Sequence, residues 1–100
     1  MLRELFLGFM RVHILYHASK NPIYGVEIMK ELSRHGYSIG PGTIYPILHA
    51  LEREGYLKSK AVTVSGKVRR YYEITNKGTE TLTESKEKIK ELVDEVLDER

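Results

Sequence analysis

The sequence predicts a mainly α-helical protein with one small β-hairpin, in the order helix, helix, helix, hairpin, helix. Apolar residues recur with helical spacing from residue 2 to residue 55 and again after residue 79, whereas the period changes to two between residues 57 and 75. A short glycine-containing segment interrupts the period-two stretch, as a hairpin requires. Three compact helices followed by a two-stranded ribbon form a winged helix-turn-helix, here extended by a C-terminal helix.

Length and composition support a single globular unit. One hundred residues leave room for one modest core, and 41% apolar with 30% charged residues is typical of a folded chain. The absence of cysteine excludes a disulfide framework and a thiolate zinc site, and fits a cytoplasmic location. Charges at Arg3, Glu4 and Arg11 interrupt the apolar start, so no run reaches the roughly 18 residues of a membrane span. We expect no membrane partner.

The first helix is expected over residues 2–18 and is apolar on more than one side. One stripe contains Leu2, Leu5, Phe6, Phe9, Val12 and Tyr16. A second set contains Leu7, Met10, Ile14 and His17. Such a helix needs two apolar partners, its own core and something else. Residues 19–22 should form a turn, because Pro22 disfavours helical backbone at Asn21.

Two further helices are expected over residues 24–35 and from residues 41–43 to Gly55. The buried stripe of the earlier helix consists of Val26, Ile28, Met29 and Leu32, with Gly36 as a left-handed cap. The inward stripe of the later one consists of Ile44, Ile47, Leu48 and Leu51. Pro46 is expected in the first turn or just past it, where a missing amide proton is tolerated.

The hairpin and the final helix complete the chain. The strands are expected over residues 57–64 and 68–75 around Ser65-Gly66-Lys67, with Tyr72 on the core side. Residues 76–78 should turn into a long polar helix over 79–99. Its narrow apolar seam is typical of helix pairing and contains Leu82, Ile89, Leu92, Val93, Val96 and Leu97. We therefore expect a winged helix-turn-helix domain at 1–75 and a C-terminal dimerisation helix at 76–100.

The net charge of +2 conceals an asymmetry between the two ends. Residues 1–75 hold 11 Lys and Arg against 6 Asp and Glu, whereas residues 76–100 hold 5 against 8. Thirteen residues of the predicted hairpin contain no acid and five cations: Lys58, Lys60, Lys67, Arg69 and Arg70. By itself such a run is equally typical of a solvated face. On an exposed ribbon it suits contact with a phosphate backbone.

Residues 22–78 contain four distinctive blocks: Tyr24-Gly25-Val26-Glu27-Ile28, Gly42-Thr43-Ile44-Tyr45-Pro46-Ile47-Leu48, Leu51-Glu52-Arg53-Glu54-Gly55-Tyr56-Leu57 and the block from Gly66 to Gly78. The most specific part is Gly-Thr-x-Tyr-Pro followed by Arg-x-Tyr-Tyr-x-x-Thr-x-x-Gly. In these blocks the chain resembles the PadR family of bacterial and archaeal transcriptional regulators. The resemblance implies a homodimer held by the first and last helices and binding a roughly palindromic operator on double-stranded DNA. It also implies a repressor relieved by a small molecule or another signal.

In a winged helix the third helix enters the major groove. Thr43, Tyr45 and His49 are therefore candidate DNA contacts. Thr43 is equally suited to cap the helix, and His49 to a solvated surface. Because the first two turns carry no Arg, Asn or Gln, direct base reading should be modest and DNA shape should contribute more.

The wing supplies the charged contacts. We expect Lys67, Arg69 and Arg70 to lie against phosphates or in a minor groove, with Lys20 as a lesser phosphate contact. The alternative function is a winged-helix module that binds another protein, without specific DNA binding and with an incidental basic wing. No nucleophile elbow, Walker loop or dinucleotide fingerprint is present, so neither an enzyme nor a catalytic residue is expected.

The dimer interface is expected to contain Phe6, Phe9, Leu92 and Val96. A pocket for a small-molecule effector at the dimer centre, lined by Phe6, Phe9, Tyr16 and Leu92, is an alternative to plain interface core. His13 and His17 are spaced i, i+4 and could share a metal ion. No cysteine or nearby carboxylate pair completes such a site, so we expect an interface or surface pair, with no metal and no other cofactor.

Overall fold

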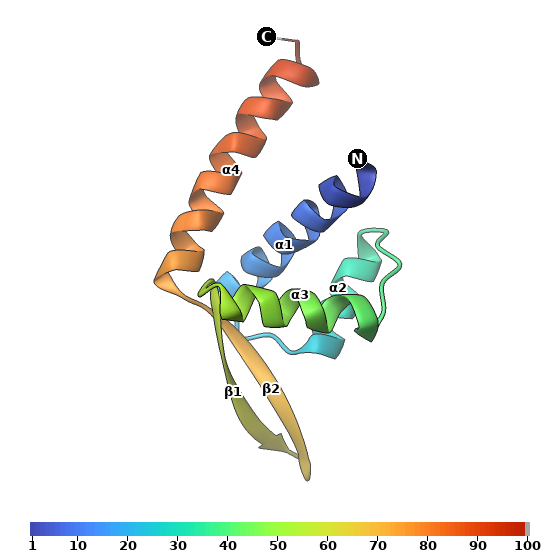
Figure 1. Ribbon diagram of the computed structural model, residues 1–100, viewed down its shortest axis with the longest axis vertical. Helices are drawn as coiled ribbons and strands as arrows, with labels where there is room; N and C mark the ends of the chain where they lie inside the picture. The colour runs from blue at the N-terminus through green and yellow to red at the C-terminus, as the bar shows by residue number, and fades with distance from the viewer. Residues whose placement is uncertain (100) are drawn as a thin grey trace.

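A computed structural model describes residues 1–99 and has the predicted order of elements. They are α1 (Leu2–Lys20), α2 (Gly25–Arg34), α3 (Pro41–Arg53), β1 (Leu57–Val64), β2 (Lys67–Ile74) and α4 (Asn76–Val96). In Figure 1 the first three helices form a compact body, the hairpin projects from one end of it, and α4 runs in the opposite direction. The mainly α fold with one hairpin is thus confirmed.

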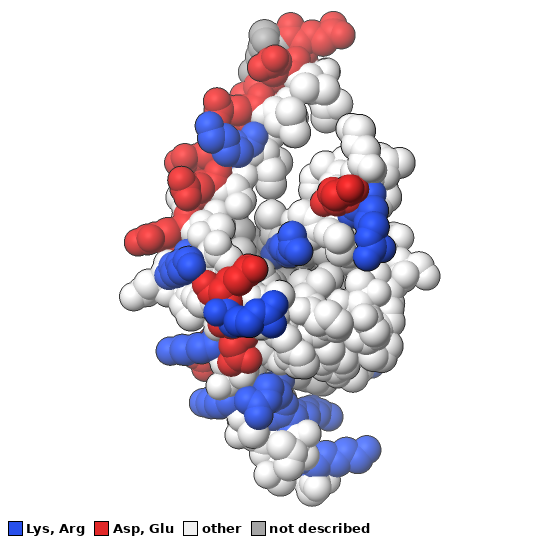
Figure 2. Space-filling model, in the orientation of Figure 1, with Lys and Arg blue, Asp and Glu red and all other residues white. Residues whose placement is uncertain are grey.

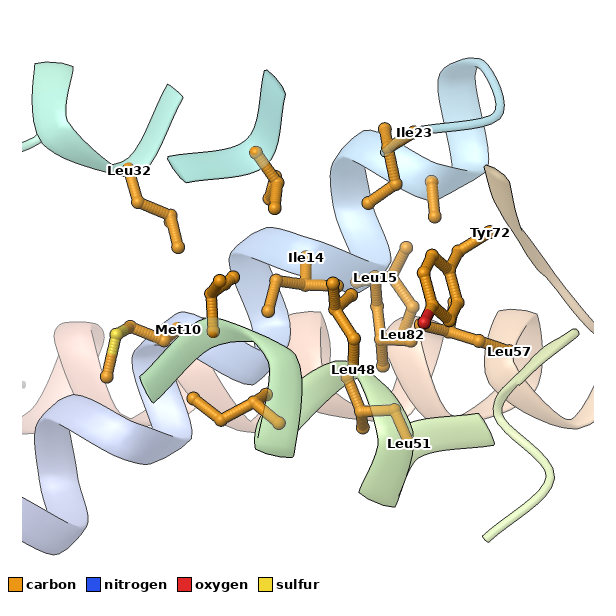
Figure 3. Close-up of a cluster of buried hydrophobic side chains, with 14 residues drawn as sticks. Met10, Ile14, Leu15, Ile23, Leu32, Leu48, Leu51, Leu57, Tyr72 and Leu82 are labelled. Carbon is orange, nitrogen blue, oxygen red and sulfur yellow. The ribbon is translucent and has the colours of Figure 1, made fainter. Parts of the chain in front are cut away.

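One hydrophobic core joins every element of the fold (Figure 3). Its members are Met10, Ile14, Leu15, Ala18, Ile23, Ile28, Leu32, Ile44, Ile47, Leu48, Leu51, Leu57, Tyr72 and Leu82. The expected inward stripe of α3 is buried throughout, and Tyr72 is only 1% exposed. Because Leu82 belongs to this core, the first half of α4 packs on the helical body.

The two sides of α1 have the different environments that the sequence predicts. Met10 and Ile14 are buried, whereas Leu2, Phe6 and Phe9 are exposed. Leu15 and Ala18 are also buried, although they were not among the expected core positions. The helix extends through Lys20 rather than ending at residue 18, because Pro22 restricts only the residue before it. Asn21 is accordingly extended, with φ −156°.

The predicted buried stripe of α2 is correct at Ile28 and Leu32 and wrong at Val26. Val26 is 46% exposed because α2 begins only at Gly25, so that Val26 lies at the helix end nearest the hairpin. Backbone hydrogen bonds link Ile23 to Tyr72 in both directions, at 3.0 and 2.7 Å. The segment before α2 is thereby fixed to the base of β2.

Glycines allow the chain to leave α2 and enter α3. Gly36 follows α2 with φ +88°, as the predicted left-handed cap requires. Gly40 is the N-cap of α3 and no side chain caps this helix, so the capping role considered for Thr43 is not observed. Pro46 lies inside α3, beyond the first turn. It removes the amide that would bond to the carbonyl of Gly42, which is exposed and therefore open to water.

The hairpin has eight residues in each strand and a two-residue turn. Val64 pairs with Lys67, so Lys67 belongs to β2 rather than to the turn. Ser65 and Gly66 have φ of +50° and +79°, the pattern of a type I′ turn. Such a turn matches the twist of the two strands and keeps the ribbon narrow.

Helix α4 begins three residues earlier than predicted, because residues 76–78 form its first turn. Thr75 is the N-cap, and its hydroxyl oxygen accepts a hydrogen bond from the Gly78 amide at 3.0 Å. Gly78 is buried against Tyr56, which lies between α3 and β1, and against Ile74 of β2. Across residues 1–99, no helix has the length and apolarity needed to cross a membrane.

Candidate nucleic-acid interface

A groove of about 420 Å³ lies between the start of α2, α3 and the hairpin. It brings Tyr45 together with all three predicted wing cations. Its lining residues are Tyr24, Gly25, Val26, Lys30, Tyr45, Lys67, Val68, Arg69 and Arg70. The groove therefore joins the third helix and the wing, the two elements that a winged helix presents to DNA.

Arg69 is held in place by two tyrosines. Its guanidinium carbon lies 4.6 Å from the centre of the Tyr24 ring, a cation–π arrangement. Tyr24 in turn meets Tyr71 edge to face, with the ring centres 5.3 Å apart. A hydrogen bond with Tyr71, and then the nearby Tyr24 hydroxyl, raise the pKa of Arg69. The stacking orients a permanent positive charge on one face of the ribbon.

Arg70 points to the opposite face, because successive strand residues alternate. Its Nη1 donates to the Ser59 hydroxyl at 3.1 Å, and that hydroxyl donates to the Glu52 carboxylate at 2.6 Å. This chain connects the wing to the last turns of α3. Arg70 therefore has a bracing role in addition to the charge it presents at the surface.

Tyr45 and His49 lie one turn apart on α3, with ring centres 6.4 Å apart. His49 is exposed, whereas Tyr45 is half-buried over the backbone at the start of α2. A Cβ placed on Gly25 would lie 2.5 Å from the Tyr45 hydroxyl oxygen. A side chain at position 25 would therefore displace the Tyr45 ring, which with glycine packs on the backbone of α2 at the edge of the groove.

Three of the predicted contacts do not line this groove: His49, Thr43 and Lys20. Thr43 is half-buried and lines a separate hollow beside Phe6 and Tyr37. The Nζ of Lys20 lies 5.4 Å from the centre of the Tyr16 ring, and Lys20 shares a different hollow with Glu27. The structure thus separates Thr43 and Lys20 from the wing cations, and contact of these two residues and of His49 with DNA stays a prediction.

The charge asymmetry of the sequence is also an asymmetry in space. Figure 2 shows Lys and Arg gathered on and around the hairpin, whereas Asp and Glu follow α4. Within residues 1–99, no carboxylate lies within 4.0 Å of a charged nitrogen of Lys60, Lys67, Arg69 or Arg70. Lys58 is different because it approaches Glu73 at 4.0 Å. The outer wing therefore presents cations without acidic partners.

Sequence reasoning missed two polar side chains of the groove. Tyr24 supports Arg69, and Lys30 adds a cation from α2. Tyr24 stands at the predicted start of a helix, two residues after Pro22, and this context gave no sign of a partner 45 positions along the chain. Lys30 follows the helical polar pattern and is indistinguishable in sequence from a solvated lysine.

Large apolar side chains remain exposed on the ends of α1 and α4 that point away from the hairpin. Phe6 is 47% exposed, Phe9 37%, Leu92 56% and Val96 59%. They share these surfaces with Leu2, Leu5, Tyr16, Ile89, Val93 and Leu97. The four expected interface residues therefore lie on two apolar helix faces that the chain does not cover by itself.

A second pocket of about 420 Å³ lies between α1, the end of α2 and α4. It contains Phe9 and Tyr16 of the predicted effector pocket, whereas Phe6 lines the hollow beside Thr43 and Leu92 lines neither. Burial, and then the neighbouring rings of His35 and His17, lower the pKa of His13 in this pocket.

Comparison with known proteins supplies the context for this geometry. Residues 14–84 match the model of the transcriptional regulator PadR-like family. The chain is 46% identical over 96 residues to transcriptional regulator Rv3488 of Mycobacterium tuberculosis, covering 96% of this chain and 90% of the relative. It also superposes on a PadR-like transcriptional regulator from Bacillus cereus with a TM-score of 0.86 and 32% identity, covering 95% and 94% of the two chains. A PadR family regulator from Eggerthella lenta gives a TM-score of 0.84 and 33% identity, with 98% and 87% covered.

Proposed function

Because the chain belongs to the PadR-like family of transcriptional regulators, which are non-enzymatic DNA-binding proteins, we propose that it binds specific duplex DNA as a homodimer and represses transcription. Helix α3 enters the major groove, and the wing lies on the phosphate backbone or in the adjacent minor groove. The dimer acts in the cytoplasm, where its binding to the operator excludes the transcription machinery. Two DNA-binding domains related by a two-fold axis match a palindromic site.

The groove between α3 and the wing carries this proposal. It gathers Lys67, Arg69 and Arg70 beside Tyr45, and Arg69 is oriented by its stacking on Tyr24. Wing cations without acidic partners are free to neutralise phosphates and release condensed counterions. Lysine is depleted at protein–protein interfaces, so Lys30 and Lys67 beside the arginines favour DNA over a protein partner.

The apolar faces of α1 and α4 support the homodimer. Phe6 and Phe9 on α1, and Leu92 and Val96 on α4, are the side chains that we place between the subunits. A second copy of the chain offers equally apolar faces, as a two-fold interface requires. Pairing through α4 leaves both wings free, because the hairpin projects in the opposite direction (Figure 1).

Fluorescence anisotropy with duplex DNA from upstream of the protein's own gene tests this function. If each subunit neutralises three phosphates, a dimer neutralises about 6, and affinity should fall by about 10³ between 50 and 200 mM salt. A scrambled duplex of equal length is the control for sequence preference. Equal affinity for both duplexes would refute specific binding, and salt-independent binding would refute the phosphate contacts.

Arg69→Ala isolates the contribution of the wing. The substitution removes two cations per dimer, so the slope of log K against log salt should decrease by about 1.8. Lys88→Ala is the matched control, because Lys88 is an exposed cation on α4 beside Glu91. Its slope should equal that of the wild type. An unchanged slope for Arg69→Ala would remove this arginine from the interface.

A further inference from the structure

Three of the four histidines of the chain meet in the pocket between α1, the end of α2 and α4. His13 and His17 lie one turn apart on α1, and His35 is the C-cap residue of α2. One ring nitrogen from each residue lies within 4.8 Å of the others. The rings of His13 and His35 have centres 4.8 Å apart, and those of His13 and His17 are 6.5 Å apart.

Their surroundings suit ligands for a metal ion. His13 and His17 are half-buried and His35 is exposed, so the cluster is reachable from solvent. Phe9, Val12 and Leu82 contribute apolar walls to the pocket. Neutral imidazole is the form of histidine that binds a metal.

We propose that His13, His17 and His35 form a binding site for one divalent transition-metal ion of the zinc class. Neutral imidazole suits zinc, copper and nickel, and three histidines with one open position are an established ligand set for zinc. In tetrahedral geometry with bonds of about 2.0–2.1 Å, ligand nitrogens lie roughly 3.4 Å apart. Rotation about the side-chain bonds closes the remaining gap without moving the helices.

The fourth position is left to water or to Glu31. A carboxylate oxygen of Glu31 lies 3.9 Å from Nε2 of His17, while the same carboxylate accepts a hydrogen bond from Arg34. Glu31 therefore lies where it can orient the His17 ring or complete the coordination. The expectation of a simple histidine pair rested on the lack of a third ligand. His35 supplies that ligand from 18 positions beyond His17.

A bound ion would add a link between α1 and the end of α2. These two helices are otherwise joined by residues 21–24 and by the hydrophobic core. Since the unfolded chain does not hold the three rings together, the ion binds the folded state preferentially. Zinc at about 100 times its dissociation constant should raise the thermal midpoint by about 10–20 °C.

Isothermal titration of zinc into the full-length, tag-free and chelator-treated protein tests the site. The wild type should bind one ion per chain, and His35→Gln should weaken binding by at least about 100-fold. His35 is exposed, so this variant should fold normally, which circular dichroism checks. His49→Gln is the matched control, because His49 is the remaining histidine and lies on α3.

Cobalt(II) provides an independent readout of geometry, since a tetrahedral site absorbs visible light far more strongly than the hydrated ion. The wild type and His49→Gln should give the tetrahedral spectrum, and His35→Gln should not. Stoichiometry below half an ion per chain, or equal affinities for the two variants, would overturn the proposal. DNA binding by metal-free protein is a separate measurement, and failure of zinc binding leaves the proposed regulator function standing.

Discussion

Gly78 lies in the first turn of α4, against Tyr56 in the connection between α3 and β1 and against Ile74 at the end of β2. A Cβ on this residue would overlap the backbone carbonyl oxygen of Tyr56 and lie 2.7 Å from Cγ1 of Ile74. The Tyr56 carbonyl cannot easily retreat, because it accepts hydrogen bonds from the Thr75 amide and hydroxyl, both at 3.1 Å. Gly78→Ala therefore forces the first turn of α4 away from the body.

The expected change in the free energy of unfolding caused by Gly78→Ala is the sum of opposing contributions. Overpacking against a fixed backbone group costs about 1–3 kcal/mol, and weakening the two hydrogen bonds of Tyr56 adds about 1 kcal/mol. The better helix propensity of alanine returns at most about 1 kcal/mol. We expect a net loss of about 2 kcal/mol per chain, which lowers the thermal midpoint by roughly 10 °C.

Thermal and urea unfolding at a fixed protein concentration measure this effect. Gly8→Ala is the matched control, because a Cβ at Gly8, in the interior of α1, would meet nothing within 4 Å. At Gly8 no overpacking opposes the better helix propensity of alanine, so the free energy of unfolding should rise by about 0.5–1 kcal/mol. The reasoning fails if Gly78→Ala unfolds at or above the wild-type midpoint while Gly8→Ala behaves as expected.

Three further substitutions test other parts of the fold. Thr75→Ala removes the α4 cap and the hydroxyl that donates to the Gly55 carbonyl at 2.6 Å, so stability should fall by about 1–2 kcal/mol in urea unfolding, and Thr75→Ser should recover most of it. Ser65→Asn should stabilise the type I′ turn by a few tenths of a kcal/mol, because asparagine tolerates the positive φ of this position better; a lower midpoint would contradict the turn assignment. Leu92→Glu should raise the dimer dissociation constant at least about 100-fold in light scattering, since it places a charge in the proposed interface, and an intact dimer would exclude Leu92 from it.

The order of elements could be predicted because their periodicities are local. Apolar residues at helical spacing in α3 and at a period of two in the hairpin reflect which side of each element is covered. The outer face of α1 was predicted to need a partner other than the core, and Phe6 and Phe9 are indeed exposed. The basic character of the wing follows from Lys67, Arg69 and Arg70 in an acid-free run.

The ends of the elements were less predictable, because contacts from elsewhere in the chain decide them. Helix α4 starts at Asn76 because the Thr75 hydroxyl bonds both to the Gly78 amide and to the Gly55 carbonyl, whereas residues 76–78 by themselves predict a turn. Val26 fits the apolar stripe of α2, but the start of that helix faces the wing groove rather than the core.

The sequence by itself determined the fold class, the faces that are apolar and the sign of charge on the wing. These properties depend on the spacing and type of neighbouring residues. Only the tertiary structure placed Tyr24 under Arg69 and His35 beside His13. Each of these pairs joins side chains that are distant along the chain, and the angles at which helices and ribbon pack determine whether such side chains meet.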